Sequence, residues 1–369
     1  MDFESADILA ADATVNALLK PLLSVLEGAV GATELCVNRP GEAFVQVGAD
    51  WRRIAVPGMT LERCLSLATA IATFTEQEIG PSKPILSAKL PGGERIQILV
   101  PPAVEQDAIS MTIRIPPRAI KDLREYEADG AFGRFVWAEA AGFEARKASL
   151  GESDRRLCEL LAERKLREFF ERAVLAKKTI AVVGDTGSGK TTLMKALCQH
   201  IPERERLLTI EDVRELLLPH HPNRVHMLYS KGRQGVADIT PADLIASCMR
   251  QKPDRILLAE LRGSEAFDFL KLLTTGHNGS ITSFHAESCA LAADRFVFMC
   301  KEHEQAAIYD TAALKRLVTL TIDVVVHVVA HSVDGGTGTP ARMERYVAEV
   351  QFDPVAKLAT RFGDAVVHS

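Results

Sequence analysis

Nine consecutive residues decide the fold: Gly184-Asp185-Thr186-Gly187-Ser188-Gly189-Lys190-Thr191-Thr192. They match the phosphate-binding loop pattern, in which a glycine is followed by four residues and then by Gly-Lys-Thr. Glycine lets the backbone curl at little steric cost, so successive N–H groups can point at phosphate oxygens. Lys190 would bring its ammonium near the β- and γ-phosphates, and Thr191 would offer its hydroxyl to Mg²⁺. The pattern therefore predicts a site for nucleotide phosphates.

The flanks of this stretch agree with that interpretation. Residues 179–183 are an apolar, β-branched run that ends at the first glycine, and residues 192–198 have helical spacing. Strand, loop and helix in this order are the context the motif requires, and the helix N-terminus favours bound phosphate. The alternative, a glycine-rich turn that binds nothing, explains neither flank.

The amino-acid composition limits the kinds of protein to which this chain can belong. The chain has 369 residues, 47% hydrophobic and 25% charged, which is typical of two or three globular domains with real cores. A formal net charge of −5 argues against a protein whose main task is to coat nucleic acid. The seven cysteines are scattered and form no Cys-x-x-Cys pair, so we expect reduced thiols in a reducing compartment. We expect neither a secretory leader in residues 1–17 nor a membrane span, because no uncharged apolar run is long enough.

Residues 1–118 predict an α+β domain with a largely antiparallel sheet. A helical pattern over residues 5–30 is interrupted by Pro21, and Thr60 can cap a second helix. Extended runs joined by Pro-Gly turns predict two hairpins, and two further strands follow the same pattern. The predicted strands are 34–38, 43–47, 51–56, 84–90, 94–100 and 110–115.

Residues 119–172 are rich in charges of alternating sign, which favours solvated helices that link two domains. A partner surface, or a linker swapped between subunits, remains an alternative for this segment. From residue 173 to 369, strands and helices alternate, which predicts a mostly parallel sheet covered on both faces. The predicted strands are 179–183, 206–210, 224–228, 255–259 and 279–284, and a closing hairpin spans 321–330 and 345–352.

Two acidic residues follow strands of this sheet. Glu211 ends the run Leu208-Thr209-Ile210, and Glu260 follows the apolar run 256–259. Because the carboxyl ends of parallel strands share one edge, both carboxylates can converge on the nucleotide. Glu260 fits a Mg²⁺-binding carboxylate, and Glu211 is a candidate to polarise water or support the metal. Alone, Glu211 would more simply cap a helix, but the second site favours a functional role.

Residues 276–286 contain two histidines beside a predicted strand. His285 ends a strand expected to lie beside that of Glu260, so it could contact Glu260 or sense the γ-phosphate. The alternative is a structural histidine at a strand end. No third ligand accompanies His277 and His285 at a metal-binding spacing, so we do not predict a zinc site.

These motifs together resemble the secretion ATPase superfamily, which powers type II and type IV secretion and type IV pili. Walker A (184–191), an Asp box (209–212), Walker B (255–262) and a His box (276–286) occur in that order. The amino-acid sequence of these motifs is similar to that of the VirB-type ATPases of type IV secretion systems. The paired cysteines of the type II secretion ATPases are absent from this sequence. The similar stretches are Met249-Arg250-Gln251-Lys252-Pro253-Asp254-Arg255, Ala259-Glu260-Leu261-Arg262-Gly263, Ser283-Phe284-His285-Ala286 and, more loosely, Met111-Thr112-Ile113-Arg114-Ile115-Pro116.

The resemblance implies an N-terminal domain (1–118), a linker (119–172) and a RecA-like motor domain (173–369), with ATP between the domains. It also implies a cytoplasmic hexameric ring at the inner membrane, working with other secretion components and ATPases on protein and, indirectly, DNA substrates. Arginines of the N-terminal domain reach the phosphates in this family. Arg114 matches that place and Arg134 matches it less well; an ordinary surface role for Arg114 remains open.

The predicted function is therefore that of an Mg²⁺-dependent ATPase that drives pilus assembly or substrate translocation. Three alternatives remain open at this stage. A pilus retraction or conjugation ATPase would carry the same motifs. A nucleic-acid motor would show DNA-stimulated, salt-dependent hydrolysis. A nucleotide-switched scaffold would need binding but hardly any turnover.

Overall fold

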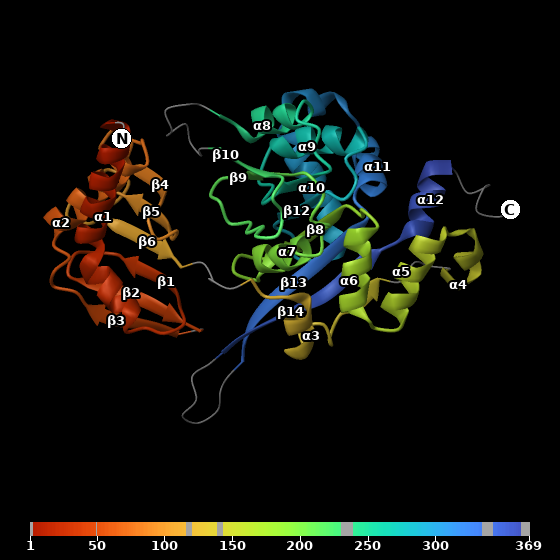
Figure 1. The fold of residues 1–369 in the computed structure, drawn as a ribbon, viewed down its shortest axis with the longest axis horizontal. Helices are drawn as coiled ribbons and strands as arrows, with labels where there is room; N and C mark the ends of the chain where they lie inside the picture. The colour runs from red at the N-terminus through yellow and green to blue at the C-terminus, as the bar shows by residue number, and fades with distance from the viewer. Residues whose placement is uncertain are drawn as a thin grey trace. The chain divides into compact units, whose positions relative to one another are not determined.

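The computed structural model describes residues 3–48, 50–115, 120–138, 143–229, 239–333 and 342–362. The chain divides into two compact units, with the main break between Arg118 and Ala119. Each unit has its own β-sheet (Figure 1).

The first unit is an antiparallel sheet packed against two helices. Its elements are α1 (Phe3–Glu27), β1 (Ala32–Val37), β2 (Glu42–Val47), β3 (Asp50–Ala55), α2 (Leu61–Phe74), β4 (Ile85–Lys89), β5 (Arg95–Leu99) and β6 (Ser110–Arg114). The strand order is β3-β2-β1-β6-β5-β4, and every neighbouring pair is antiparallel. Leu19 of α1, Ile71 of α2 and Leu35 of β1 share one buried core. The predicted α+β organisation and both predicted hairpins are confirmed.

The predicted interruption of the first helix at Pro21 is wrong. Proline has no N–H, so it cannot bond the carbonyl four residues earlier, which here belongs to Ala17. Arg63 of α2 supplies the missing donor: a terminal guanidinium nitrogen lies 2.6 Å from the Ala17 oxygen, and Nε lies 3.0 Å from the Leu18 oxygen. Because the freed carbonyl is satisfied from another helix, α1 continues through Pro21.

The second unit is an eight-stranded sheet with helices on both faces. Its elements are α3 (Leu123–Ala128), β7 (Val136–Ala138), α4 (Phe143–Arg146), η1 (Lys147–Ser149), α5 (Glu152–Ala162), α6 (Leu166–Leu175), β8 (Ile180–Gly184), α7 (Lys190–Cys198), β9 (Leu207–Glu211), β10 (Arg224–Leu228), α8 (Pro241–Cys248), β11 (Arg255–Leu258), α9 (Glu265–Thr274), β12 (Ile281–Phe284), α10 (Cys289–Lys301), η3 (Glu304–Ile308), α11 (Thr311–Thr321), β13 (Val324–Val333), β14 (Arg342–Phe352) and α12 (Pro354–Phe362). The strand order is β10-β9-β11-β12-β8-β13-β14-β7. From β10 to β13 every neighbouring pair is parallel, which confirms the predicted mostly parallel sheet.

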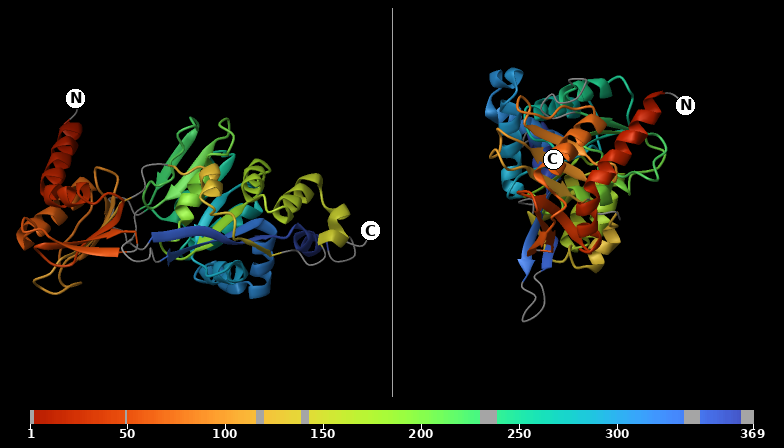
Figure 2. Two further views of the ribbon diagram at one scale, coloured as in Figure 1. Left: turned by 90° about the horizontal axis from the view of Figure 1, so that it is seen from below. Right: turned by 90° about the vertical axis from the view of Figure 1, so that its left-hand side faces the viewer.

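Alternation along the central strand explains why both faces are covered. Ile180 and Val182 of β8 pack into one core with α6 and α7, whereas Ala181 and Val183 pack into a second core with α9 and α10. The edge-on view in Figure 2 shows helices on both sides of this sheet. The two strands predicted as a closing hairpin, β13 and β14, are neighbours in the sheet, and residues 334–338 between them lie outside the described residues.

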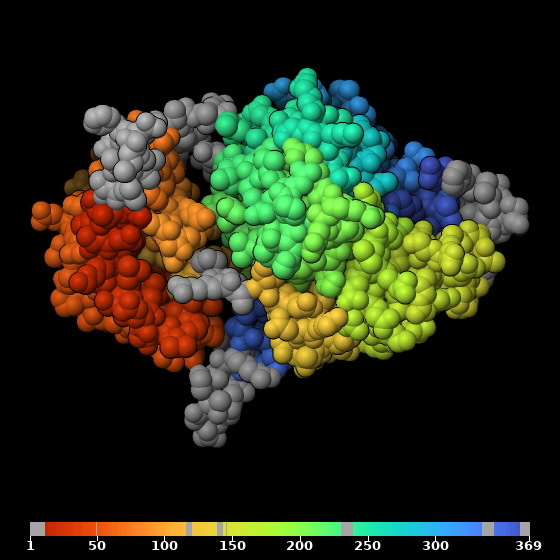
Figure 3. Space-filling view, viewed as in Figure 1, coloured from red at the N-terminus to blue at the C-terminus, as the bar shows by residue number. Residues whose placement is uncertain are grey.

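The charged segment 119–172 contributes heavily to the second unit. Leu123 and Tyr126 of α3, Leu157 of α5 and Phe169 of α6 belong to the same buried core as Ile180 and Val182 of β8. In Figure 3, α3 (amber) and α5 and α6 (yellow-green) form a continuous surface with the rest of the unit. The charges lie outside, and the apolar residues between them anchor the segment to the sheet.

All seven cysteines are free thiols, and six of them are buried, in keeping with the predicted reduced state. Within the described ranges, no helix has the length and apolar character needed to cross a bilayer.

Candidate functional site

The phosphate loop lies between the end of β8 and the start of α7. Gly184, Gly187 and Gly189 have φ angles of 150°, 75° and 101°, which side chains rarely tolerate. A Cβ on Gly184 would also come within 2.2 Å of the carbonyl oxygen of Val328 on β13. The glycines of the motif are therefore required by this backbone, and the strand–loop–helix context is present.

Lys190 folds back over this loop. Its side chain is almost fully buried, with the residue 7% exposed, and Nζ lies 3.0 Å from the carbonyl oxygens of both Gly184 and Asp185. Nζ also lies 3.4 Å from Nδ1 of His285. The Ser188 hydroxyl is buried and has no hydrogen-bond partner among the described residues. An orphaned buried hydroxyl is rare, so a ligand at the loop is its natural partner.

The loop is the start of a chain of charged contacts along the sheet edge. His285 Nε2 lies 3.0 Å from Glu260 Oε1, and Arg262 Nε donates to Glu260 Oε2 at 2.7 Å. A terminal nitrogen of Arg262 then lies 3.7 Å from Asp212 Oδ2. These residues follow β12, β11 and β9, which stand side by side next to β8. Predicted site residues Lys190, Glu260 and His285 thus come together at the carboxyl edge.

Glu211 has a different environment. It is 0% exposed, and both of its carboxylate oxygens are engaged within the unit. One oxygen accepts from the Thr209 hydroxyl at 2.7 Å and faces His226 Nδ1 at 3.1 Å. The other accepts from the backbone N–H groups of Glu215 and Leu216 at 2.7 and 2.8 Å. The Glu211 carboxylate therefore holds together the end of β9 and the loop that follows it.

The helix of the phosphate loop lies close to this buried acid. Burial raises the pKa of the Cys198 thiol to about 12, and the Glu211 carboxylate adds to that rise. Asp212, the next residue, carries the acid that joins the chain of charged contacts. β9 ends at Glu211, so Asp212 lies in the bend that follows the strand, where its side chain is free of the strand's alternation.

Two further residues near the site were not found by sequence reasoning. Arg345 of β14 donates from Nε to the carbonyl oxygen of Gly187 at 3.0 Å. Burial raises the pKa of Tyr229, and the neighbouring Asp212 carboxylate reinforces the shift, so this tyrosine lies beside the charged chain. Neither carries a motif signal, and Arg345 lies far along the chain from the loop it contacts.

The remaining predicted residues occupy simple positions. Thr191 and Thr192 are in the first turn of α7, and the Thr186 N–H donates to Asp185 Oδ1 at 2.6 Å. His277 precedes β12, where Nδ1 lies 3.1 Å from the Thr275 hydroxyl, and so lies at the end of that strand opposite His285.

The two predicted arginines lie in different units. Arg114 ends β6 of the first unit, with Nε 3.7 Å from Glu34 Oε1, and its predicted contact with phosphate stays a prediction. Arg134 lies in the second unit and pairs with Glu344 of β14 at 3.3 Å.

The donor set is compatible with Mg²⁺ held partly by a nucleotide. Among the described residues, no group of three or more His, Cys, Asp or Glu side chains could hold a metal ion without help. Mg²⁺ in nucleotide sites usually takes one or two protein oxygens together with phosphates and water. The Thr191 hydroxyl and the Glu260 carboxylate are oxygen donors of that kind.

Two cavities in the second unit differ in chemistry. One of about 460 Å³ adjoins the phosphate loop and is lined by Gly184, Asp185 and His285, and by Leu291 and Phe298 of α10. A larger one, of about 700 Å³, lies at the opposite edge of the sheet, where β8 and β13 begin.

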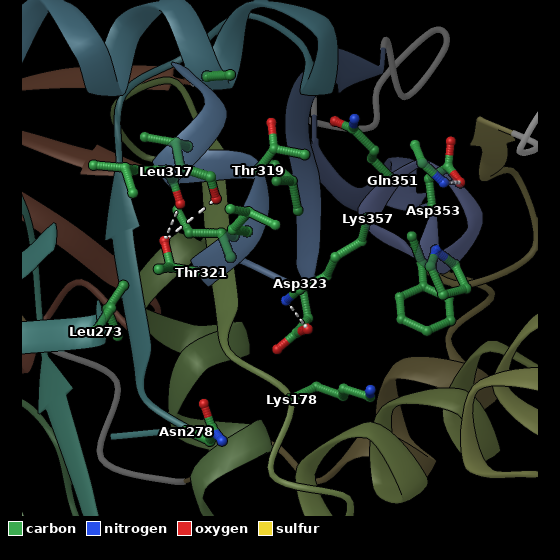
Figure 4. A pocket seen from close by; sticks show the side chains of 18 of the residues that line it. Lys178, Leu273, Asn278, Leu317, Thr319, Thr321, Asp323, Gln351, Asp353 and Lys357 are labelled. Carbon is green, nitrogen blue, oxygen red and sulfur yellow. Dashed lines mark hydrogen bonds and ion pairs between the residues drawn. The ribbon is translucent and has the colours of Figure 1, made fainter. Parts of the chain in front are cut away.

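The larger cavity offers no phosphate site. In Figure 4, Lys357 reaches toward Asp323, and their atoms are 2.5 Å apart. Lys178, also on its wall, is paired with Asp154 at 2.5 Å. Because these charges are paired with one another and the glycine loop is at the other edge, the smaller cavity is the candidate nucleotide site.

The fold and the site define a class of protein: a RecA-like α/β domain with a phosphate loop, preceded by an α+β unit. The family described as "Type II/IV secretion system protein" matches residues 155–334. The type IV secretion system protein VirB11 of Brucella suis is 45% identical over 94% of this chain and 92% of its own length. PtlH of Bordetella pertussis is 44% identical over 79% of this chain and 84% of its own.

A solved structure agrees with these relatives. The VirB11 ATPase of the Brucella suis type IV secretion system, in complex with sulphate, matches with a TM-score of 0.51 and 43% identity. The match covers 96% of this chain and 99% of that one. This chain belongs to the VirB11 family of type IV secretion ATPases.

Proposed function

We propose that this chain is an Mg²⁺-dependent ATPase motor that energises pilus assembly or substrate translocation in a type IV secretion system. The chain of contacts from Lys190 through His285 to Glu260 carries the proposal, because it joins a phosphate-binding cation to a carboxylate that can orient water. Membership of the VirB11 family supports the pathway.

The roles follow from the chemistry of each group. Lys190 would leave its loop carbonyls to meet the β- and γ-phosphates, while the loop amides donate to phosphate oxygens. Glu260 orients the attacking water, and His285 holds Glu260 and detects the γ-phosphate from the neighbouring strand. Bound Mg²⁺ would supply positive charge to the phosphates and would be held by Thr191 and Glu260. The loop residues in contact with nucleotide would be Gly184, Asp185, Thr186, Gly187, Ser188, Gly189 and Thr192.

The two acids after β9 take different parts in this scheme. Asp212 reaches Glu260 through Arg262 and so fixes the direction of the catalytic carboxylate. Glu211 would support the fold at the end of β9 and would take no direct part in the reaction, because it is fully buried and both of its carboxylate oxygens are occupied.

Arg114 of the first unit would neutralise charge that develops on the γ-phosphoryl group and couple hydrolysis to closure of the two units. This role rests on the match of Arg114 to the family's N-terminal arginine. Replacing Arg114 by Ala should lower kcat at least tenfold and leave the stability of the first unit intact, whereas a surface role predicts parental turnover.

Assembly and location complete the proposal. The chain would form a homo-hexameric ring on the cytoplasmic side of the inner membrane, docked on secretion components that include other ATPases. Its substrates would be proteins and, indirectly, DNA. Family membership supports these points.

The decisive experiment compares phosphate release by the purified parent and by Lys190→Ala, with and without Mg²⁺. Lys271→Ala, which replaces an exposed lysine of α9, serves as the matched control. We expect the Lys190 variant and the metal-free parent to be inactive and the control to be parental. Parental turnover by Lys190→Ala would refute the site.

Three further measurements separate the alternatives. Stimulation by DNA that falls with salt would favour a nucleic-acid motor. Secretion supported by a hydrolysis-dead Glu260 variant would favour a nucleotide-switched scaffold. Pili that fail to retract in a deletion strain would favour a retraction motor.

A further inference from the structure

We propose that Arg345 of β14 is a positioning residue for the phosphate loop, which it holds through the carbonyl group of Gly187. The inference rests on the proposed ATPase function and adds to it a residue from outside the four motifs. Arg345 Nε donates to the Gly187 oxygen at 3.0 Å, across 158 residues of sequence. A Cβ placed on Gly189 would lie 3.3 Å from Arg345 Cδ, so the side chain also packs against the loop backbone.

The position of Arg345 is fixed by its neighbours on β14. Glu344 pairs with Arg134 at 3.3 Å, and the Arg134 guanidinium lies 5.5 Å from the centre of the Tyr346 ring. Tyr346 also meets the His331 ring of β13 edge-on, at 5.6 Å between ring centres. Because Glu344 and Tyr346 are both held by these contacts, the backbone of Arg345 has a fixed position. Its side chain extends from there to the loop.

A bond to the Gly187 oxygen has a direct effect on the anion-binding groups. In a trans peptide the carbonyl and the following N–H point in opposite directions, so the Gly187 oxygen and the Ser188 N–H are turned together. In this structure the Ser188 N–H donates to the Asp185 carbonyl oxygen at 3.2 Å, a bond that closes the turn of the loop. Arg345 therefore fixes the Gly187–Ser188 peptide in the orientation that closes this turn, and so helps to set the shape of the loop whose backbone N–H groups would bind phosphate.

Arg345 complements Lys190 in this respect. Lys190 bonds the carbonyl oxygens of Gly184 and Asp185, which begin the loop, and it is expected to leave them for the nucleotide. Arg345 bonds the carbonyl in the middle of the loop and need not move. The loop thus keeps one cationic anchor while its lysine engages ATP.

The rival explanation is that Arg345 contributes only positive charge near the phosphates. Three substitutions separate the two. Arg345→Gln places an amide N–H where Nε stands and removes the charge. Arg345→Met has the same length to that point but ends in a methyl group. Arg345→Lys keeps the charge and has a methylene in place of Nε.

The experiment measures kcat/KM for ATP and the thermal unfolding of the full chain for each variant. We expect Arg345→Met and Arg345→Lys to lose about tenfold in kcat/KM, and Arg345→Gln to stay within about threefold of the parent, all with parental melting. Impaired Gln and Met variants beside a parental Lys variant would assign the effect to charge and overturn the inference. Parental values for all three would overturn it as well.

Lys190→Ala and the parent, run in the same series, keep this result separate from the proposed function. If the parent hydrolyses ATP and Lys190→Ala does not, an unchanged Arg345 series sinks only the role of Arg345. An inactive parent would instead refute the ATPase assignment.

Discussion

Glu211 and Glu260 end or follow neighbouring strands of one sheet, yet they occupy opposite environments. Glu211 is fully buried and bonds a hydroxyl, a histidine and two backbone N–H groups. Glu260 keeps 22% of its side chain exposed and is held by His285 and Arg262, both of which can change partners. A fully buried carboxylate with both oxygens occupied supports the fold, whereas a partly exposed one at the sheet edge that carries the phosphate loop can serve a reaction. Sheet position alone therefore does not define a catalytic acid.

The sharpest test of this contrast is Glu260→Gln, which keeps shape but removes the negative charge that orients water. Turnover should fall about a thousandfold, since a positioned acid–base group contributes on the order of 10²–10⁴. Thermal unfolding should stay parental because the site lies at the surface of the unit. Phosphate release and melting curves measure the two effects.

The matched control is Glu287→Gln, an exposed acid near the site, on the wall of the smaller cavity. Its turnover should remain within about threefold of the parent, the scatter expected of surface changes. Retention of more than a tenth of parental turnover by Glu260→Gln would remove Glu260 from the catalytic role.

The opposite end of β11 provides the second test, because it carries a charge that serves only the fold. Arg255 is 0% exposed; its Nε lies 2.6 Å from Glu205 Oε2, and a terminal nitrogen donates to the Val174 oxygen at 2.8 Å. In Arg255→Met, the largely buried Glu205 carboxylate would keep Lys177, 3.7 Å away, as its cationic neighbour. The free energy of unfolding should fall by about 3 kcal/mol, as when one partner of a buried pair is removed.

Denaturant unfolding measures that loss, and the double variant Arg255→Met/Glu205→Gln sharpens it. Removing the second charge should recover part of the lost stability, because the uncompensated carboxylate causes much of the cost. A double variant that is less stable than Arg255→Met would contradict the buried-pair explanation.

Glu211→Gln is the direct counterpart of Glu260→Gln and should have the opposite effects: a loss of stability with little change in turnover. The amide replaces one acceptor oxygen by a donor, which leaves at least one buried hydroxyl or backbone N–H without its partner. Stability should fall by about 2 kcal/mol, within the range for an unsatisfied buried group. Turnover of the folded protein should remain within about threefold. Turnover that collapses at parental stability would place Glu211 in the reaction and erase the contrast.

Much of the second unit could be predicted because its signals are local. Each strand of the parallel sheet is a short apolar, β-branched run followed by a turn, and the glycine loop fixes which strand carries the phosphate site. The same runs predict that Lys190, Glu260 and His285 lie at one edge of the sheet, the carboxyl ends of its parallel strands.

The contacts that escaped prediction join residues far apart in sequence. The sequence predicts the closing hairpin of β13 and β14, but no local pattern encodes that β13 joins the sheet beside β8, which brings Arg345 to the loop. Pro21 stays within α1 because Arg63, from another helix, bonds the carbonyl that proline frees. In both cases a long cationic side chain satisfies a backbone oxygen at a distance, and only the assembled fold shows which oxygen it reaches.

The smallest expected effect is on the pH dependence of stability. It extends the contrast between buried side chains and side chains of the candidate site from glutamate to histidine. His285 stands at the site with 41% of its side chain exposed, whereas Nδ1 of His327 on β13 is buried without a hydrogen-bond partner among the described residues. Burial lowers the pKa of His327 below its usual 6.5, and the Glu349 carboxylate opposes the shift. The unfolded chain therefore takes up this proton first as pH falls, so stability present above pH 6.5 is lost between 6.5 and the lower folded-state pKa.

Melting temperatures between about pH 7.5 and 5.5 should fall less steeply for His327→Gln than for the parent, with His277→Gln, at the exposed turn before β12, following the parent. Equal slopes for the parent and His327→Gln would show that burial of this imidazole has no cost, and the distinction between buried and site groups would then hold for the carboxylates alone.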